Sequence, residues 1–162
     1  MNKRARVQNS ATMSIVSNDF KDLILLISPR VGKTVIVLNA LKGFTDLTKR
    51  NQKVLVIASF NPILKSWKVE IIKWKAEHLD ITLLNQRSLS KVKLGQYDII
   101  VVDEVHELSL KQVLQLRGLK DKSKIFGITG SLSQTTETSL KDLLGLEVKF
   151  RYPIEMAIKD GI

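Results

Sequence analysis

Five short apolar runs recur along the chain, and segments with helical spacing separate them. The runs consist mostly of Val, Ile and Leu without polar alternation, which is typical of strands covered on both faces. They span residues 23–28, 54–59, 81–84, 97–102 and 125–129. The helical candidates span residues 33–44, 63–77, 110–117 and 138–144. This alternation predicts an α/β fold, an open, mostly parallel sheet with helices on both faces, whose ligands bind at the carboxyl ends of the strands.

Composition narrows the class of protein. The 162 residues include no Cys and only two His, which excludes a disulfide-stapled scaffold and a structural zinc site. The formal net charge of +10 favours a polyanionic partner such as nucleic acid, nucleotide or anionic lipid. No apolar run approaches the roughly 18 to 20 residues that a membrane span needs, so we expect no membrane segment.

The chain is expected to form one domain with a short N-terminal extension. It contains no linker rich in Gly, Ser or Pro. Residues 1–19 include Lys3, Arg4 and Arg6 near their start, and polar side chains follow. We therefore expect a basic, frayed arm. The alternative is an arm that contacts phosphate. The folded domain would then span residues 20–162.

A candidate phosphate-binding loop follows the first predicted strand. Residues 28–34 are Ser-Pro-Arg-Val-Gly-Lys-Thr and lead directly into a predicted helix. In a P-loop, backbone N–H groups at a helix N-terminus surround the phosphates, a Lys contacts the β- and γ-phosphates, and a Ser or Thr hydroxyl binds Mg²⁺. The predicted nucleotide-binding residues are Arg30, Val31, Gly32, Lys33 and Thr34, with Thr34 as a metal ligand. The alternatives are a chance Gly-Lys-Thr at a structural turn and an Arg30 that projects into solvent; Ile27 also replaces the first Gly of the full pattern.

Two consecutive carboxylates, Asp103 and Glu104, end the fourth predicted strand. Carboxylates at the end of so apolar a strand need a compensating cation or hydrogen-bond donors. Bound Mg²⁺ would serve, with Asp103 holding the metal through water and Glu104 accepting a proton from the water that attacks the γ-phosphate. The alternative is that both acids cap the next helix. Lys33 lies 70 residues before Asp103, with a strand, a helix and a strand between them, which favours the catalytic interpretation.

The order of these motifs resembles the first RecA-like lobe of superfamily-two helicases, especially SWI/SNF-type translocases and related phage enzymes. Residues 32–34 match motif I, and residues 103–106, Asp-Glu-Val-His, match motif II. Residues 54–59 and 62–74 resemble the strand and helix of motif Ia, and residues 127–131 resemble motif III. The resemblance extends over residues 20–162. It implies a RecA-like P-loop NTPase domain, lobe one of a helicase, that binds ATP and Mg²⁺.

The resemblance also implies roles for residues outside the first two motifs. His106, together with Thr129 and Ser131, would couple hydrolysis to nucleic-acid binding. The nucleic-acid backbone would be contacted by Lys65, Ser66, Arg87 and Ser88. Trp67 and Trp74 fit core packing at helical spacing better than base stacking. No adenine-reading Gln is recognised upstream of the phosphate loop.

The function that the resemblance implies is ATP binding and hydrolysis by one lobe of a helicase or nucleic-acid translocase. Family members place ATP between two lobes, and the second supplies an arginine finger worth about 10³ to 10⁵ in rate. No second lobe follows in the sequence, so we expect it to act in cis or in trans, and we expect the isolated lobe to be a poor ATPase. We expect DNA rather than RNA as the partner. The location expected is intracellular and cytoplasmic, in the host cytoplasm if the protein is phage-encoded.

Two other functions remain open at this stage. One is a stand-alone nucleic-acid or partner-binding module with a helicase-like fold and no effective ATPase activity. Such a module would bind nucleic acid in a salt-sensitive manner, indifferent to ATP and to the loss of Lys33. The other is a small-molecule kinase that uses the same P-loop, which the motif Ia and motif III matches disfavour.

Overall fold

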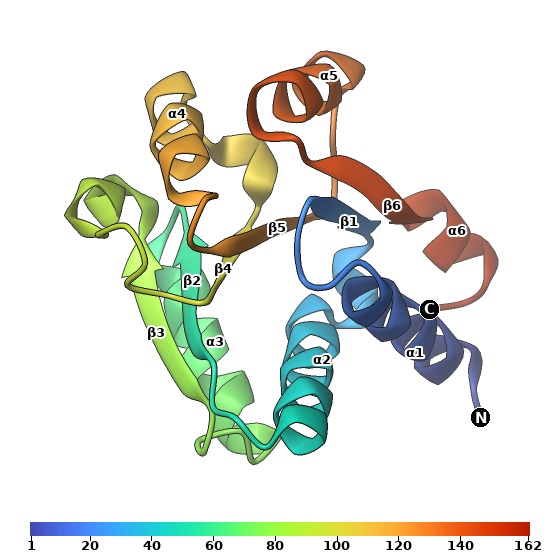
Figure 1. Cartoon of the computed structure of the whole chain (residues 1–162). Helices are drawn as coiled ribbons and strands as arrows, with labels where there is room; N and C mark the ends of the chain where they lie inside the picture. Colours follow the sequence, from blue (N-terminus) through green and yellow to red (C-terminus); the bar gives the residue numbers. More distant parts are fainter.

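A six-stranded sheet in the order β3-β2-β4-β5-β1-β6 forms the centre of the molecule (Figure 1). All five neighbouring pairs of strands are parallel. The computed structural model describes residues 1–162. The strands are β1 (Leu23–Ile27), β2 (Lys53–Ala58), β3 (Asp80–Asn85), β4 (Ile99–Asp103), β5 (Lys124–Thr129) and β6 (Glu147–Tyr152). The open parallel sheet expected from the apolar runs is confirmed, and β6 is an addition to it.

Helices cover both faces of the sheet. They are α1 (Lys3–Ser17), α2 (Lys33–Thr48), α3 (Asn61–Lys73), α4 (Leu110–Leu119), α5 (Gln134–Leu144) and α6 (Ile154–Lys159). Three short 3₁₀ helices, η1 (Pro29–Val31), η2 (Gln86–Lys91) and η3 (Val105–Glu107), follow β1, β3 and β4. Figure 1 shows α1, α2 and α3 on one side of the sheet and α4 and α5 on the other. No helix combines the length and apolarity that crossing a bilayer requires.

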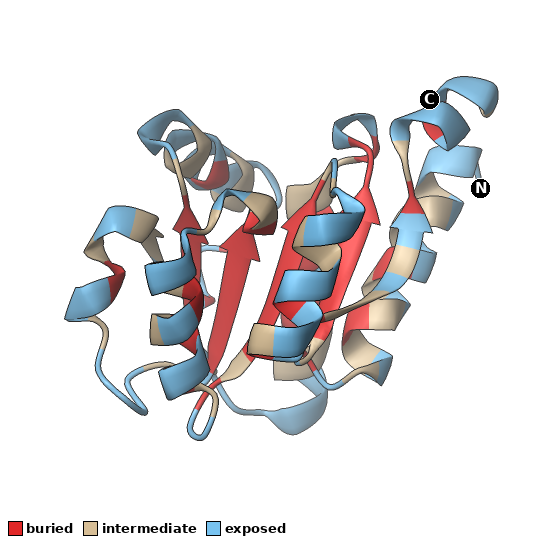
Figure 2. Cartoon of the chain, turned by 90° about the horizontal axis from the view of Figure 1, so that it is seen from above, coloured by how far each residue is buried: buried red, intermediate tan, exposed pale blue.

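Two hydrophobic cores lie on the two faces of the sheet. Successive side chains of a strand point to opposite faces, so Val101 packs with the core beneath α1, α2 and α3, whereas Val102 packs with the core beneath α4 and α5. The central strands β1 and β4 are buried at every position, as Figure 2 shows in red. This explains their continuous apolar sequences, because neither face of these strands meets water.

The N-terminal segment differs from expectation, because residues 3–17 form helix α1 instead of a frayed basic arm. Asn2 caps this helix by accepting a hydrogen bond from the Ala5 backbone N–H at 2.8 Å. Ala11 and Ile15, four residues apart, are both fully buried and belong to the core beneath α2. The expectation of an arm was wrong because only a narrow stripe of apolar side chains of this helix faces the core, and polar residues separate these positions along the sequence. The folded structure therefore begins before residue 20.

Parallel pairing brings the chemically interesting segments to one edge of the sheet. The phosphate loop follows β1, the acid pair ends β4, and Thr129 ends β5, which lies between these two strands. Asp103 is in register with Ile128 of β5, and Thr129 is in register with Leu26 of β1. The carboxyl ends of three neighbouring strands therefore supply one site.

Candidate functional site

The phosphate loop is a tight turn between β1 and α2. Ser28 is buried, and its hydroxyl accepts a hydrogen bond from the Arg30 backbone N–H at 3.4 Å, which begins the 3₁₀ turn η1. Gly32 then takes a left-handed conformation, with φ of 96°, and α2 begins at Lys33. Ile27, which replaces the first Gly of the usual pattern, is a fully buried residue of β1 paired with Tyr152. No positive φ occurs at that position, so nothing there requires Gly.

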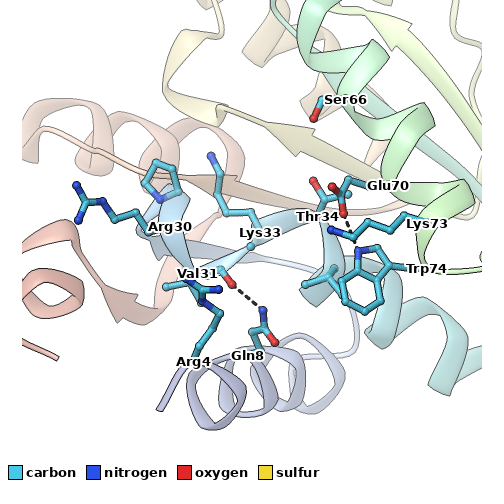
Figure 3. A pocket seen from close by; sticks show the side chains of 13 residues that line it. Arg4, Gln8, Arg30, Val31, Lys33, Thr34, Ser66, Glu70, Lys73 and Trp74 are labelled. Carbon is cyan, nitrogen blue, oxygen red and sulfur yellow. Dashed lines mark hydrogen bonds between the residues drawn. The ribbon is translucent and has the colours of Figure 1, made fainter. Parts of the chain in front are cut away.

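Helix α1 supports the phosphate loop from below. The Gln8 side chain donates a hydrogen bond from Nε2 to the Val31 carbonyl oxygen at 2.7 Å, and Figure 3 draws this contact. A Cβ atom at Gly32 would lie 3.2 Å from Gln8 Nε2 and 3.3 Å from Val35 Cγ1. Gly32 is therefore needed both for its backbone conformation and for the close approach of α1. Gln8 was not predicted from the sequence, because its role depends on an α1 helix that was not expected.

A cavity of about 340 Å³ opens over the loop (Figure 3). Its floor consists of loop residues, including Thr34 at the start of α2, and α1 contributes Arg4 and Gln8. The opposite wall is made by residues of α3 and its C-cap: Ser66, Glu70, Lys73 and Trp74. The exposed Arg30 guanidinium donates instead to the Ile162 carbonyl oxygen at 3.4 Å, so it is directed toward the C-terminal residue. The cavity is strongly cationic, as a site for a polyphosphate would be.

The two tryptophans of α3 occupy different environments. Trp67 is fully buried, in accord with the core packing expected of it. Trp74 is 38% exposed and lines the cavity wall, where its Nε1 donates to Glu70 Oε2 at 2.6 Å. The expectation of core packing was wrong for Trp74 because α3 ends at Lys73, so the helical face that buries Trp67 does not continue.

Lys33 joins the phosphate loop to the acid pair. Its Nζ forms an ion pair with Glu104 Oε1 and lies 3.7 Å from Asp103 Oδ1. The Lys33 side chain is only 12% exposed and that of Asp103 only 7%, so water screens these charges weakly. The structure thus brings Lys33 together with the two acids, which lie about 70 residues away in the sequence.

Opposing effects act on the pKa of the Asp103 carboxyl group. Burial raises the pKa of its carboxyl group, while the charge of Lys33 and a hydrogen bond from Trp67 oppose that rise. The Trp67 Nε1 donates to Asp103 Oδ2 at 2.8 Å. The other oxygen, Oδ1, is buried and accepts no hydrogen bond. A buried carboxylate oxygen without a donor beside a cationic loop is suited to a metal ion or its water.

Glu104 shares Lys33 with Asp103 and has further partners of its own. It adopts a left-handed conformation with φ of 53°. Its Oε2 lies 3.3 Å from His106 Nδ1 and accepts from the Thr129 hydroxyl at 3.5 Å. Neither acid serves as a helix cap by its side chain, since η3 has no side-chain cap and Ser109 caps α4. The capping alternative for the acid pair therefore does not apply.

The residues expected to couple hydrolysis to nucleic-acid binding form a connected network with Glu104. His106 Nδ1 lies 2.7 Å from the Thr129 hydroxyl, which also contacts the backbone of Ser131 through its carbonyl at 2.7 Å and its N–H at 3.3 Å. Gly127 allows η3 to approach β5, because a Cβ atom there would lie 2.8 Å from Val105. A change at Thr129 would consequently be felt at Glu104.

The expected nucleic-acid residues lie on two adjoining segments at the same edge of the sheet. Lys65 and Ser66 are exposed on α3, although Ser66 also lines the cavity over the phosphate loop. Arg87 is exposed and Ser88 is half-buried in η2. The two segments are joined where Asn85 donates to Asn61 at 3.1 Å.

The donor set fits Mg²⁺ bound together with a polyphosphate. Thr34 offers a hydroxyl and Asp103 offers the free oxygen Oδ1, which are the oxygen ligands that this cation prefers. No group of three or more His, Asp or Glu side chains is placed to hold a metal by itself. Mg²⁺ usually keeps several waters and takes substrate phosphates as ligands, so a dedicated protein cage is not required.

Comparison with known proteins supports the fold through structure alone. No family model and no curated protein matches the sequence. The UvsW helicase from bacteriophage T4 superposes with a TM-score of 0.72 at 14% identity, over 91% of this chain and 59% of that one. The Hef helicase domain of Pyrococcus furiosus gives 0.66 at 15% identity, over 91% of this chain and 37% of that one. The SWI2/SNF2 ATPase core of Sulfolobus solfataricus, solved with double-stranded DNA, gives a TM-score of 0.65 at 19% identity, over 94% of this chain and 37% of that one.

These similarities assign the fold. The chain has the architecture of a helicase RecA-like lobe, which confirms the fold class and the structural resemblance expected from the sequence motifs. It spans less than two thirds of each of these similar structures.

Proposed function

We propose that the chain is the ATP-binding and hydrolysing lobe of a helicase or nucleic-acid translocase and works with a second RecA-like lobe. The observation that supports this most directly is the position of Lys33, paired with Glu104 and close to Asp103 at the mouth of the phosphate loop. A purely structural turn has no need of a cation held between two acids, because burying charged groups is costly.

In this proposal, the ion pair of Lys33 and Glu104 belongs to the nucleotide-free state. Lys33 turns from Glu104 to the β- and γ-phosphates when ATP enters, while backbone N–H groups at the start of α2 bind the phosphate oxygens. Glu104 is then free to accept a proton from the attacking water. Thr34 and Asp103 would hold Mg²⁺, and the ion would supply positive charge to offset that of the phosphate oxygens.

The network of Thr129, His106 and Ser131 would report the position of Glu104 to the surface that binds nucleic acid. On that surface, the exposed cations Lys65 and Arg87 would contact phosphates without reading sequence, together with Ser66 and Ser88. The net charge of +10 supports such an interaction. We propose DNA as the partner, because two of the similar structures, the SWI2/SNF2 core and the restriction-modification enzyme LlaBIII, were solved with DNA.

The second lobe would complete the site from the open side of the cavity. An arginine finger contributes about 10³ to 10⁵ in rate in well-studied NTPases, or roughly 4 to 7 kcal/mol of barrier. The cations that line the cavity here all belong to this one lobe, so none of them is a finger supplied by a second lobe. The isolated chain should bind Mg-ATP but turn it over slowly.

Binding of a fluorescent ATP analogue to the chain tests the proposal. A charge-assisted hydrogen bond is worth about 1.5 to 3 kcal/mol, so Lys33→Ala should weaken binding about 10- to 150-fold. Lys111→Ala, which removes an exposed Lys on the far face of the sheet, is the matched control and should leave binding unchanged.

Glu104→Gln separates binding from chemistry. It should preserve or tighten ATP binding, because it removes the partner that competes for Lys33, and it should abolish hydrolysis stimulated by nucleic acid and a second lobe. ATP binding that is indifferent to Lys33→Ala would overturn the proposal. Salt-sensitive DNA binding that persists unchanged in that variant would then favour the stand-alone binding module.

A further inference from the structure

Trp67 is the only side chain that donates a hydrogen bond to the proposed metal-binding carboxylate. It is fully buried near the middle of α3, and its Nε1 donates to Asp103 Oδ2 at 2.8 Å. A buried indole N–H needs an acceptor, and a carboxylate is a strong one. The two residues are 36 positions apart, so this bond joins two different elements, α3 and β4.

The strand pattern of β4 directs the Asp103 carboxylate toward α3. Ile99 and Val101 belong to the core beneath α1, α2 and α3, and Asp103 follows them at the same spacing of two. Trp67 belongs to that same core and is fully buried, so packing restricts its ring. The carboxylate therefore meets a donor whose own position is set by the core.

The hydrogen bond gives the two carboxylate oxygens different roles. Oδ2 is occupied by the indole, whereas Oδ1 is buried, accepts no hydrogen bond and lies 3.7 Å from Lys33 Nζ. Without the indole, the Asp103 side chain could rotate and present either oxygen. A group held by a partner outside the site reorganises less when its ligand arrives, which is how outer partners tune metal sites.

Helix α3 also contributes residues to both proposed binding sites, the one for nucleotide and the one for nucleic acid. Its wall residues Ser66 and Glu70 line the nucleotide cavity, and Lys65, immediately before Ser66, is exposed on the proposed nucleic-acid surface. An α-helix is stiff along its length, so a shift or tilt of α3 relative to the sheet would alter the geometry of the bond between Trp67 and Asp103. Hydrogen bonds weaken steeply as the angle at the donated hydrogen becomes bent.

We propose that Trp67 is a positioning residue that orients Asp103 for Mg²⁺ and transmits nucleic-acid contact at α3 to that carboxylate. This inference rests on the proposed function, because it assumes that Asp103 serves Mg-ATP. The coupling is reciprocal: DNA bound at α3 alters the affinity for Mg²⁺ with nucleotide, and Mg²⁺ with nucleotide alters the affinity for DNA by the same factor.

The first experiment measures how nucleotide binding depends on Mg²⁺. Trp67→Phe keeps an aromatic ring in the core but removes the N–H. Loss of an outer partner typically weakens metal affinity 10- to 100-fold, so the Mg²⁺ concentration needed for binding of a fluorescent ATP analogue should rise at least 10-fold. Binding without Mg²⁺ should not change. Tyr152→Phe is the matched control, because it also removes an aromatic side-chain donor to a carboxylate, that of Asp160, outside the cavity, and it should leave the Mg²⁺ requirement unaltered.

The second experiment observes the parent chain itself. The chain has two Trp residues, so an ¹⁵N–¹H spectrum contains two indole N–H signals, and the signal that is lost in Trp67→Phe belongs to Trp67. Addition of a short DNA duplex should shift the Trp67 signal through its bond to the sheet. The Trp74 signal should move little, because Trp74 and its acceptor Glu70 travel together on one helix.

The outcomes are distinguishable from failure of the proposed function. If binding of the ATP analogue requires Lys33 but its Mg²⁺ requirement is the same in Trp67→Phe and the parent chain, the positioning role is refuted and the ATP site stands. If DNA binds while both indole signals stay fixed, the transmission through Trp67 is refuted. If Lys33→Ala leaves ATP binding intact, the proposed function itself fails.

Discussion

Replacement of Ile15 by Ala provides a strong test of the N-terminal helix as part of the fold. Ile15 is fully buried beneath α2, so the substitution removes three buried carbon atoms. At about 0.8 kcal/mol for each buried methylene, transfer alone amounts to about 2.4 kcal/mol. The cavity left behind brings the expected loss into the range of about 2 to 5 kcal/mol. For a domain of this size, the melting temperature should fall by roughly 5 to 20 °C.

Urea denaturation, followed by circular dichroism, measures this loss of unfolding free energy directly. Met13→Ala is the matched control, since Met13 lies on the same helix and is 61% exposed. That variant should stay within about 0.5 kcal/mol of the parent chain. If Ile15→Ala and Met13→Ala prove equally harmless, residues 3–17 do not belong to the core, and a detached basic arm becomes the correct description.

Three further substitutions test the site and the C-terminal elements. Gly127→Ala places a Cβ 2.8 Å from Val105 and should cost about 1 to 3 kcal/mol of unfolding free energy in urea, partly recovered by Val105→Ala in the same chain. Asp103→Asn removes a carboxyl group whose pKa burial raises; its melting temperature should exceed that of the parent at pH 7, and the difference should vanish as the pH falls below the unfolded Asp pKa. Tyr152→Phe removes the bond that lowers the pKa of Asp160; its melting temperature should be reduced at pH 7, and the deficit should disappear as the pH falls through that lowered pKa.

The strands that are completely buried were the ones that the sequence predicted best. The central strands β1 and β4 have continuous apolar runs because both of their faces are covered, and continuous runs are easily recognised. The edge strand β6 was not predicted, because only one face is covered and exposed residues such as Lys149 and Arg151 interrupt the pattern. Helix α1 was not predicted for a related reason, since only Ala11 and Ile15 of its fifteen residues are buried.

Within the candidate site, local motifs identified the residues but not their partners. Each of the two motifs, the Gly-Lys-Thr turn and the acid pair, consists of consecutive residues, so Lys33 and Asp103 could be recognised from their immediate neighbours in the sequence. The contacts of Trp67 with Asp103 and of Gln8 with Val31 depend on how distant elements pack, over separations of 36 and 23 residues. The periodicity of one segment does not indicate which distant segment will pack against it. A three-dimensional structure was required to find them.

The left-handed backbone at Glu104 limits what evolution or design can place at this position. Residues with a Cβ pay about 1 kcal/mol or more in that conformation, and β-branched residues more still, whereas Gly, Asn and Asp tolerate it. A library randomised at this one codon and selected only for soluble expression should therefore be enriched in Gly, Asn and Asp. If Glu104 has the proposed role in hydrolysis, selection for ATP turnover together with a second lobe should return Glu, and the locally unfavourable residue would then be explained by its chemistry.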